Sequence, residues 1–216
     1  MSYEFGGILR ERIAQNLAAF ARQPHVDEAL RRAAVVIVVA ETEIASGGGP
    51  MGDACVLLTR RASGLRRHAG QYALPGGRLD PGETPAQAAL RELREELRLD
   101  LAPAAILGVL DDYATRSGFI ITPIVAWGGP AHDLAPDPTE VERIHRIPFA
   151  DLDSPAIPHL ARQRDGEPPV LSAPIATLGH RVYAPTAAIL YQFREVALHG
   201  RPTRVAHFGQ PRFAWK

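Results

Sequence analysis

Residues 77–99 read GRLDPGETPAQAALRELREELRL, and this segment carries most of what the sequence says about the fold. Its second half predicts an amphipathic helix over residues 84–98, because apolar side chains recur there at the spacing of one helix face. Thr84 suits the N-cap, Pro85 suits the first turn, and Gln87 completes a capping box with Thr84. The sequence therefore predicts a helix with a defined start and one buried face.

The charged residues of this helix separate by sign onto two flanks. Glu92, Glu95 and Glu96 project from one side of the apolar stripe, and three arginines project from the other. Glu92 and Glu96 are like charges four residues apart, which destabilises a helix. A hard divalent cation would reverse that effect, because Mg²⁺ prefers carboxylate and phosphate oxygens. A merely solvated acidic face is the alternative interpretation.

The residues around the helix match a longer spaced pattern. Gly77, Glu83 and the run RELREE at 91–96 fit G-x5-E-x7-R-E-U-x-E-E, where U is aliphatic. This pattern resembles the Nudix box, the signature of Nudix hydrolases. The box continues with x-G-U, and Arg98 stands here in place of the glycine that ends the helix in the family. The resemblance implies an α/β fold, a Nudix α/β/α sandwich with a mixed β-sheet and a catalytic loop–helix–loop.

The resemblance also implies a metal site. Glu92, Glu95 and Glu96 correspond to the carboxylates that hold Mg²⁺ or Mn²⁺, and the carbonyl of Gly77 is placed to contribute. A cation held there would bridge a pyrophosphate and neutralise its charge while water attacks phosphorus.

Other residues of the box correspond to the catalytic machinery of the family. Glu83 and Arg91 match the pair that braces the loop against the helix. Glu95 is one candidate for the general base, and Glu140 and Glu142 are downstream candidates, with ordinary surface charge as the alternative for those two. The catalytic residues implied are Glu83, Arg91, Glu95 and Glu96.

A second pattern precedes the helix. The segment LLTRRA at 57–62, then Arg66, Gly70 and LPGG at 74–77, resembles the extra signature of the coenzyme A diphosphatase branch, with leucine for phenylalanine at position 74. Residues 181–187, RVYAPTA, resemble a weaker downstream segment of that branch. The branch implies hydrolysis of coenzyme A or its thioesters to 3′,5′-ADP and 4′-phosphopantetheine or its acylated form.

A basic cluster precedes the box in a chain that is otherwise neutral. Guanidinium groups bind phosphate in a bidentate manner, which suits a substrate that carries several phosphates. A solvated arginine-rich loop is the alternative. The candidate substrate-binding residues are Arg60, Arg61, Arg66, Arg67 and His68.

Three other functions compete with coenzyme A hydrolysis. The first is a diphosphatase for ADP-ribose or another nucleoside diphosphate derivative. The second is a catalytically silent Nudix module that binds a nucleotide, which the intact glutamates disfavour. The third is an RNA decapping-type enzyme, which the absence of a global basic face disfavours. A small nucleotide-containing pyrophosphate is therefore the expected partner, and nucleic acid and membranes are not.

Composition narrows the function further. The chain has 216 residues, 24 basic and 24 acidic side chains, and thus no net charge. Lys216 is the only lysine, which excludes a Walker P-loop. Cys55 is the only cysteine, and its apolar surroundings predict a buried strand thiol. No signal-peptide core and no apolar run of membrane-spanning length occur, so we expect a cytoplasmic protein.

The chain is expected to contain an N-terminal helical extension at 1–32, a Nudix domain at 33–198 and a tail at 199–216. Residues 27–32 are expected to add a helical turn, and the proline-rich segment 155–174 to form a loop or lid. Residues 47–52 match G-x-G-x-x-G, but a strand follows them where the dinucleotide motif needs a helix. A homodimer is one assembly that the resemblance allows. Helices are expected at 6–22 and 186–198, and strands at 33–42, 54–60, 72–74, 105–110, 119–127, 141–147 and 181–183.

Overall fold

The structure, a computed structural model, describes residues 3–42, 52–65, 69–130, 133–163 and 166–211. Its helices are α1 (Gly7–Ala19), α2 (Pro85–Leu97), α3 (Phe149–Leu152) and α4 (Thr186–Phe193), with a π-helical turn at Arg194–Leu198 and 3₁₀ turns at Pro103–Ala105 and Ala176–Leu178. Its strands are β1 (Arg31–Glu41), β2 (Ala54–Arg61), β3 (Tyr72–Ala73), β4 (Gly76–Arg78), β5 (Ile106–Val109), β6 (Tyr113–Ala114), β7 (Phe119–Gly129), β8 (Val141–Pro148), β9 (His159–Ala161), β10 (Val170–Ile175) and β11 (His180–Tyr183).

Most strands form one mixed sheet, and a small sheet stands apart from it. The large sheet runs in the order β3-β2-β1-β7-β5, with β4 joined to β1, β6 to β7 and β8 to β2. Strands β1 and β7 are parallel, whereas β1 and β2 form an antiparallel pair. The small sheet has the order β11-β10-β9. The predicted α/β fold with a mixed sheet is confirmed.

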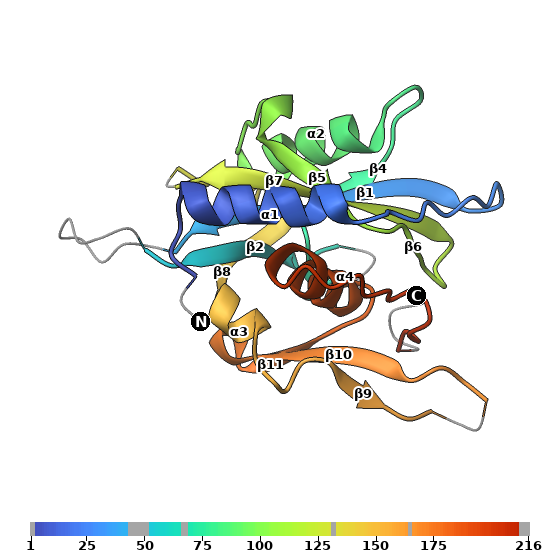
Figure 1. The fold of residues 1–216 in the computed structure, drawn as a ribbon. Coiled ribbons are helices and arrows are strands. Elements are labelled where there is room, and N and C mark those ends of the chain that lie inside the picture. The colour runs from blue at the N-terminus through green and yellow to red at the C-terminus, as the bar shows by residue number, and fades with distance from the viewer. Residues whose placement is uncertain (1–2, 43–51, 66–68, 131–132, 164–165, 212–216) are drawn as a thin grey trace.

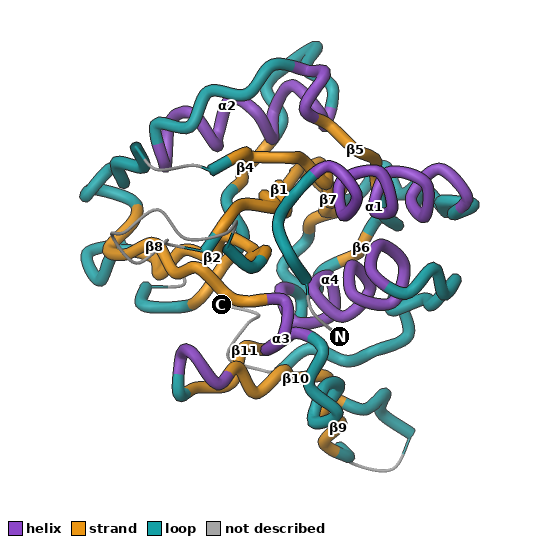
Figure 2. The backbone as a smooth tube through the Cα atoms, turned by 60° about the vertical axis from the view of Figure 1, so that its left-hand side comes forward, coloured by secondary structure: helices purple, strands orange, loops and turns teal. Residues whose placement is uncertain are grey.

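The large sheet is covered on both faces. Alternate residues of β1 enter two different cores: Val36 and Val38 pack with Leu93 of α2, whereas Ile37 packs with Ile13 of α1. Helix α4 and the small sheet share the second core with α1. Figures 1 and 2 place α2 on one side of the sheet and α4 with β9–β11 on the other. A strand buried on both faces reads as an uninterrupted apolar run, as residues 33–40 do.

The helical turn expected at 27–32 is reduced to a hydrogen-bonded turn, in which the Leu30 N–H donates to the Asp27 carbonyl at 3.2 Å, and residues 31–32 belong to a strand instead. Strand β1 already begins at Arg31, whose backbone N–H donates to the carbonyl of Gly118 at 3.0 Å. The register pairs Arg31 with Phe119 at the start of β7. Pairing with a strand nearly ninety residues away outweighs the weak local preference for helix.

The expected loop at 155–174 is also wrong, because β9 and most of β10 lie within it. Pro158 and Pro169 come immediately before the two strands, where a strand needs no ladder N–H from the preceding residue. Leu171 of β10 is fully buried in the second core. These two prolines therefore mark the beginnings of strands and not the absence of strands.

The N-terminal helix packs directly onto the rest of the fold. Leu9, Ile13 and Leu17 of α1 are buried, and Asn16 Nδ2 donates to the carbonyl of Ala197 at 2.9 Å. The division of the chain at residues 32 and 198 stays a prediction, as do the homodimer and the cytoplasmic location. No helix in the described part of the chain has the length and apolar character needed to span a bilayer.

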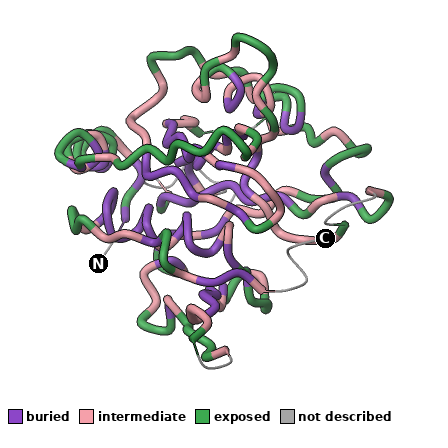
Figure 3. Tube along the Cα trace, turned by 90° about the vertical axis from the view of Figure 1, so that its right-hand side faces the viewer, coloured by how far each residue is buried: buried purple, intermediate pink, exposed green. Residues whose placement is uncertain are grey.

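The strand thiol behaves as expected. Cys55 is fully buried in β2, and burial raises its pKa to about 11. Figure 3 shows the buried residues concentrated in the central strands and in the layer beneath them. Cys55 is therefore part of the core and not a reactive group.

Candidate functional site

Helix α2 begins as the sequence predicts. The Thr84 hydroxyl accepts a hydrogen bond from the Gln87 N–H at 3.3 Å, and Gln87 Oε1 accepts one from the Thr84 N–H at 2.9 Å. Pro85 occupies the first turn. This reciprocal cap fixes the point at which the loop enters the helix, and therefore the placement of every glutamate that follows.

The helix ends at Leu97 with a turn at Arg98, although the glycine that the Nudix box has at this position is absent. Arg98 adopts the left-handed conformation with φ of 57°, and its N–H donates to the Arg94 carbonyl at 3.0 Å. Among the described residues it is the only one besides glycine with positive φ. The chain keeps the family's turn and accepts the conformational cost of a side chain at that position.

Arg91 ties the loop to the helix. Its guanidinium makes a two-pronged ion pair with Glu83, at 2.9 Å from Nε to Oε1 and 3.0 Å from Nη2 to Oε2. It also donates to the Arg78 carbonyl at 3.0 Å. Hydrogen bonding to Arg91 is the main reason that the pKa of Glu83 lies below its ordinary value. This geometry agrees with the bracing role that the sequence assigned to the pair.

Glu92 lies against the backbone of Gly77. A β-carbon at Gly77 would overlap the Glu92 carboxylate, so only glycine allows this approach. Arg91 Nη1 donates to Glu92 Oε1 at 2.9 Å. Burial raises the pKa of Glu92 in spite of this contact. The backbone of β4 therefore packs directly against the Glu92 carboxylate of α2.

Glu96 is the most deeply buried acid of the site, with 4% of its surface exposed. Among the described residues its Oε2 atom has no hydrogen-bond partner. The charge of Arg61 is the main influence that favours the ionised form of Glu96, and a backbone hydrogen bond from Gly76 has a smaller effect in the same direction. Burial, with a smaller effect of Glu92, raises its pKa to about 8. A buried and unpartnered carboxylate oxygen is costly unless a cation or a proton satisfies it.

Two of the three predicted metal ligands, Glu92 and Glu96, lie together beside β4. Glu92 and Glu96 lie one helical turn apart beside Gly76 and Gly77, and their hard oxygen atoms suit Mg²⁺ or Mn²⁺. Glu95 instead accepts a hydrogen bond from Arg91 Nη1 at 3.0 Å. In the described ranges no three acidic, histidine or cysteine side chains converge on one point. The residues therefore fit a cation as a pair, and a third ligand from Glu95 stays a prediction.

The two downstream candidates for the general base differ in position. Glu140 is close enough to raise the pKa of both Glu92 and Glu96, and its carbonyl accepts a hydrogen bond from the Ala62 N–H at 2.8 Å. Glu142 forms an ion pair with Arg60 at 3.2 Å. Only Glu140 lies near the acidic pair.

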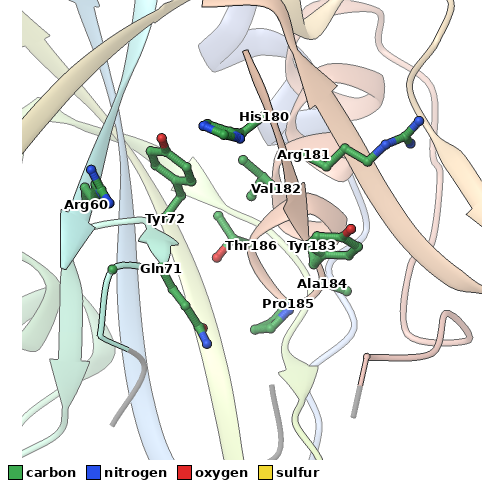
Figure 4. A pocket seen from close by; sticks show the side chains of 11 residues that line it. Arg60, Gln71, Tyr72, His180, Arg181, Val182, Tyr183, Ala184, Pro185 and Thr186 are labelled. Carbon is green, nitrogen blue, oxygen red and sulfur yellow. The ribbon is translucent and has the colours of Figure 1, made fainter. Parts of the chain in front are cut away.

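A cleft beside the site joins segments that are far apart in the sequence. One cavity of about 350 Å³ has Arg60 and Tyr72 on one wall and β11 with the start of α4 on the other. Figure 4 shows His180 and Thr186 directed toward Tyr72, whereas the Arg181 side chain extends away. A second cavity of about 280 Å³ shares Tyr72 and Thr186 with the first and reaches Gly76 and Gly77.

The basic cluster is only partly brought to this cleft. Arg60 lines the first cavity and Arg61 the second, and Arg61 also lowers the pKa of Glu96 through its charge. The remaining predicted substrate-binding residues, Arg66, Arg67 and His68, lie outside the described residues. Of the two described members of the cluster, Arg61 is the one whose charge acts on the acidic pair.

Sequence reasoning missed several residues that line the cleft. Arg78 and Phe119 line the second cavity, and Tyr72 and His180 line the first. Arg78 directly follows Gly77, which was a usable signal. The other three had none, because their proximity depends on strand pairing and on the position of the small sheet.

Comparisons with known proteins agree with this geometry. A NUDIX domain model matches residues 30–168. The chain is 40% identical over 97 residues to the uncharacterized Nudix hydrolase NudL of Photorhabdus laumondii, covering 44% of this chain and 52% of that protein. It is 31% identical over 155 residues to Nudix hydrolase 3 of Caenorhabditis elegans, covering 68% and 62%. The chain thus spans about half the length of NudL.

A solved structure supports the fold independently. The MutT/nudix family protein from Enterococcus faecalis superimposes with a TM-score of 0.53 at 16% identity, over 92% of this chain and 78% of that one. At that identity the likeness concerns the fold alone. With a domain match that spans the sheet and α2, and with the box residues arranged around Gly77, this chain belongs to the Nudix family.

Proposed function

We propose that this protein is a Mg²⁺- or Mn²⁺-dependent Nudix hydrolase that cleaves the pyrophosphate bond of a nucleotide-containing small molecule. The observation that carries the proposal is the Oε2 atom of Glu96, which is buried beside Glu92 and has no hydrogen-bond partner in the described part of the chain. A structural carboxylate in that position would be expected to have a cationic or hydrogen-bonding partner from the protein. This one is left for a ligand.

The residues have distinct parts in the proposed reaction. Glu92 and Glu96 hold the cation, and Glu83 with Arg91 keeps the loop in place against the helix. The cation, when bound, neutralises charge on the pyrophosphate. A carboxylate takes a proton from the attacking water, whose oxygen bonds to phosphorus as the bridging phosphorus–oxygen bond breaks. Glu140 is favoured over Glu142 for that proton by its proximity to the acidic pair, and Glu95 remains a candidate within the box.

Coenzyme A or one of its thioesters is the substrate we favour, with 3′,5′-ADP and 4′-phosphopantetheine, or its acylated form, as products. Support comes from the two segments that resemble the coenzyme A diphosphatase branch. Residues 70–77 and 180–186 lie far apart in the chain but line the same pair of adjoining cavities. A long substrate with several anionic groups suits a divided cleft that carries arginines in both parts.

Hydrolysis assays separate this substrate from its rivals. Coenzyme A, ADP-ribose and a nucleoside triphosphate are each incubated with Mg²⁺ or Mn²⁺, and the products are resolved by chromatography. Release of 3′,5′-ADP from coenzyme A alone is the expected result. Turnover of ADP-ribose instead would keep the chemistry and overturn the substrate. Binding without turnover of any compound would indicate the silent module.

The proton acceptor can be tested with a matched pair of variants. Glu140→Gln and Glu142→Gln remove the same charge from neighbouring positions of the 137–142 segment. Loss of a general base lowers the rate by about 10²- to 10⁴-fold. We expect that loss for Glu140→Gln and less than a threefold change for Glu142→Gln. If both variants keep full kcat while Glu95→Gln loses it, the base is Glu95.

A further inference from the structure

Two arginines that have no acidic partner among the described residues lie against one aromatic ring at the edge of the cleft. The guanidinium carbon of Arg31 lies 4.2 Å from the centroid of the Phe119 ring, and that of Arg78 lies 5.3 Å from it. In the part of the chain that the structure describes, neither guanidinium forms an ion pair or a side-chain hydrogen bond. The neighbouring Arg32, by contrast, reaches Asp112 at 3.6 Å.

The nearby carboxylates are already occupied. Asp80 and Glu83 line the same surface hollow as Arg31 and Arg78, but both are paired with Arg91, at 3.7 and 2.9 Å. Two positive charges held near one ring repel each other unless an anion lies between them. Both arginines are exposed to solvent, and among the described residues no carboxylate is left to pair with them, so their charges favour an anion in this hollow.

Hydrogen bonds fix the backbone that carries the ring. Thr115 Oγ1 accepts a hydrogen bond from the Phe119 N–H at 3.0 Å, and the Thr115 N–H donates to the Phe119 carbonyl at 2.7 Å. The Arg31 N–H is bonded to Gly118 in the same turn at 3.0 Å. A guanidinium stacked on a fixed ring keeps its edge N–H groups free and oriented, which favours bidentate contact with phosphate.

The position of the pair separates it from the proposed metal site. Arg78 follows Gly77 in β4, and successive strand residues point to opposite faces. Because the α-carbon of Gly77 faces Glu92, Arg78 lies on the other face of the strand. Nevertheless Arg78, Phe119, Gly77 and Arg61 line one cavity of about 280 Å³. A ligand in this cavity can therefore reach Arg78 and the Gly77 edge of the proposed metal site, and Arg31 lines the surface hollow that it shares with Arg78.

We propose that Arg31 and Arg78, stacked on Phe119, form a second anion site that binds a phosphate monoester of the substrate, separate from the pyrophosphate that is cleaved. The inference builds on the proposed function, since it places a second anionic group on the same substrate. It assigns substrate selection to residues outside the Nudix box and outside the basic cluster at 60–68. The two arginines act in binding and not in the chemical step.

Two pairs of compounds that differ by one phosphate provide the test. Binding of 3′,5′-ADP and of 5′-AMP is measured by calorimetry, and kcat/KM is measured for coenzyme A and 3′-dephospho-coenzyme A. We expect the native protein to prefer the compound with the extra phosphate by about tenfold to a hundredfold, the usual effect of hydrogen bonds to a charged group. Arg78→Met and Arg31→Met should each remove most of that preference and leave the dephosphorylated compound almost unaffected.

Controls keep the test decisive. Arg12→Met removes an arginine that lies 5.9 Å from the ring of Tyr3, away from the cleft, and should change neither preference. Arg78→Lys keeps the charge and should restore part of the preference if Arg78→Met folds poorly. If the variants weaken binding and kcat/KM equally for both compounds of each pair, the arginines contact the pyrophosphate and the proposal is overturned. Variants that keep the native preference would also overturn it.

The binding measurement separates this proposal from the proposed function. Preference for 3′,5′-ADP that both variants abolish, in a protein that hydrolyses nothing, would sustain the anion site and reject the hydrolase. Turnover of coenzyme A with no preference between the paired compounds would sustain the hydrolase and reject the anion site.

Discussion

Two buried glutamates in this protein have almost the same exposure and opposite surroundings. Glu195, in the π-helical turn after α4, is 5% exposed and is paired with Arg194 at 2.9 Å and Arg201 at 3.1 Å. Glu96 in α2 is 4% exposed, and one of its oxygens has no hydrogen-bond partner among the residues that the structure describes. The difference teaches that burial alone does not identify a functional acid. The missing partner does, because a structural charge in a protein interior is compensated.

The surroundings of Arg194 show how the protein satisfies the charge of a buried side chain. Besides the Glu195 contact, Arg194 Nη1 donates to the carbonyls of Leu152, Ser154 and Ile157, at 3.2, 3.2 and 2.8 Å. These contacts tie the end of α4 to the segment after α3. We therefore regard this region as structural and the α2 region as the one that requires a ligand.

The largest expected effect is on catalysis. Glu96→Gln should lower kcat/KM by about 10²- to 10⁴-fold, the range for loss of an essential catalytic carboxylate. The metal-free variant should be at least as stable as the native protein, since a neutral side chain removes the cost of burying the charge. Steady-state kinetics and urea unfolding measure both quantities.

Glu195→Gln is the matched control for that experiment. It makes the same chemical change at a glutamate of similar exposure. It should lower the free energy of unfolding and leave the kcat of the folded enzyme within about threefold of the native value. A Glu96→Gln enzyme that keeps kcat within threefold would remove Glu96 from the catalytic residues.

The next effect is on folding. Arg194→Met should lower the free energy of unfolding by about 3–5 kcal/mol, the usual result of leaving one member of a buried ion pair without its partner. The activity of the folded fraction should stay unchanged, because Arg194 does not line either cavity. Urea titration followed by circular dichroism gives the stability. A loss below about 1 kcal/mol would mean that the pair is not compensated in the way described.

The stability of the region around α3 and the end of α4 should also depend on pH, through Asp153. Burial acts to raise the pKa of Asp153, but hydrogen bonds from Tyr3 at 2.8 Å and His199 at 2.7 Å outweigh it, so the pKa lies below its ordinary value. An acid with a lowered pKa stabilises the fold above its ordinary pKa, and this contribution is lost as pH falls through the lowered one.

Asp153→Asn tests that dependence. The variant should lose on the order of 1 kcal/mol at neutral pH and should show a flatter decline of stability below about pH 4. Thermal unfolding at a series of pH values measures the slope. Identical slopes in the native protein and the variant would show that Asp153 does not contribute to acid sensitivity.

The smallest effect concerns the turn after Glu96. Arg98→Gly should raise the stability by about 1 kcal/mol, because glycine adopts the left-handed conformation without the steric cost of a side chain. Arg94→Gly, one turn earlier in α2, should lower the stability by a similar amount, because glycine is unfavourable inside a helix. Calorimetric melting temperatures of the two variants compare them directly. A gain from both substitutions would contradict the assigned conformations.

Much of the α2 region could be predicted from neighbouring residues. The cap at Thr84, the apolar stripe through Leu93 and the bracing pair of Glu83 and Arg91 follow from spacing along one helix and its preceding loop. The strand at β1 was predicted by its apolar run, although its first two residues were expected to be helical. The strands within 155–174 were missed because the prolines there were interpreted as interrupting structure.

The remaining features depend on distant contacts. Helical spacing places Glu96 nearer than Glu95 to the apolar stripe, but it does not show that an oxygen of Glu96 has no partner among the described residues or that Glu95 is paired with Arg91. The meeting of Arg31, Phe119 and Arg78 requires β1, β4 and β7 to be assembled first.

The sequence alone therefore established the Nudix box, its capped helix and the set of acidic residues from which a metal site can be built, because periodicity and capping act over a few residues. Only the assembled fold revealed which of those acids lacks a partner and which arginines lack a counter-ion. Burial and charge pairing are properties of residues brought together across the sheet, so they exist only once the layers have packed.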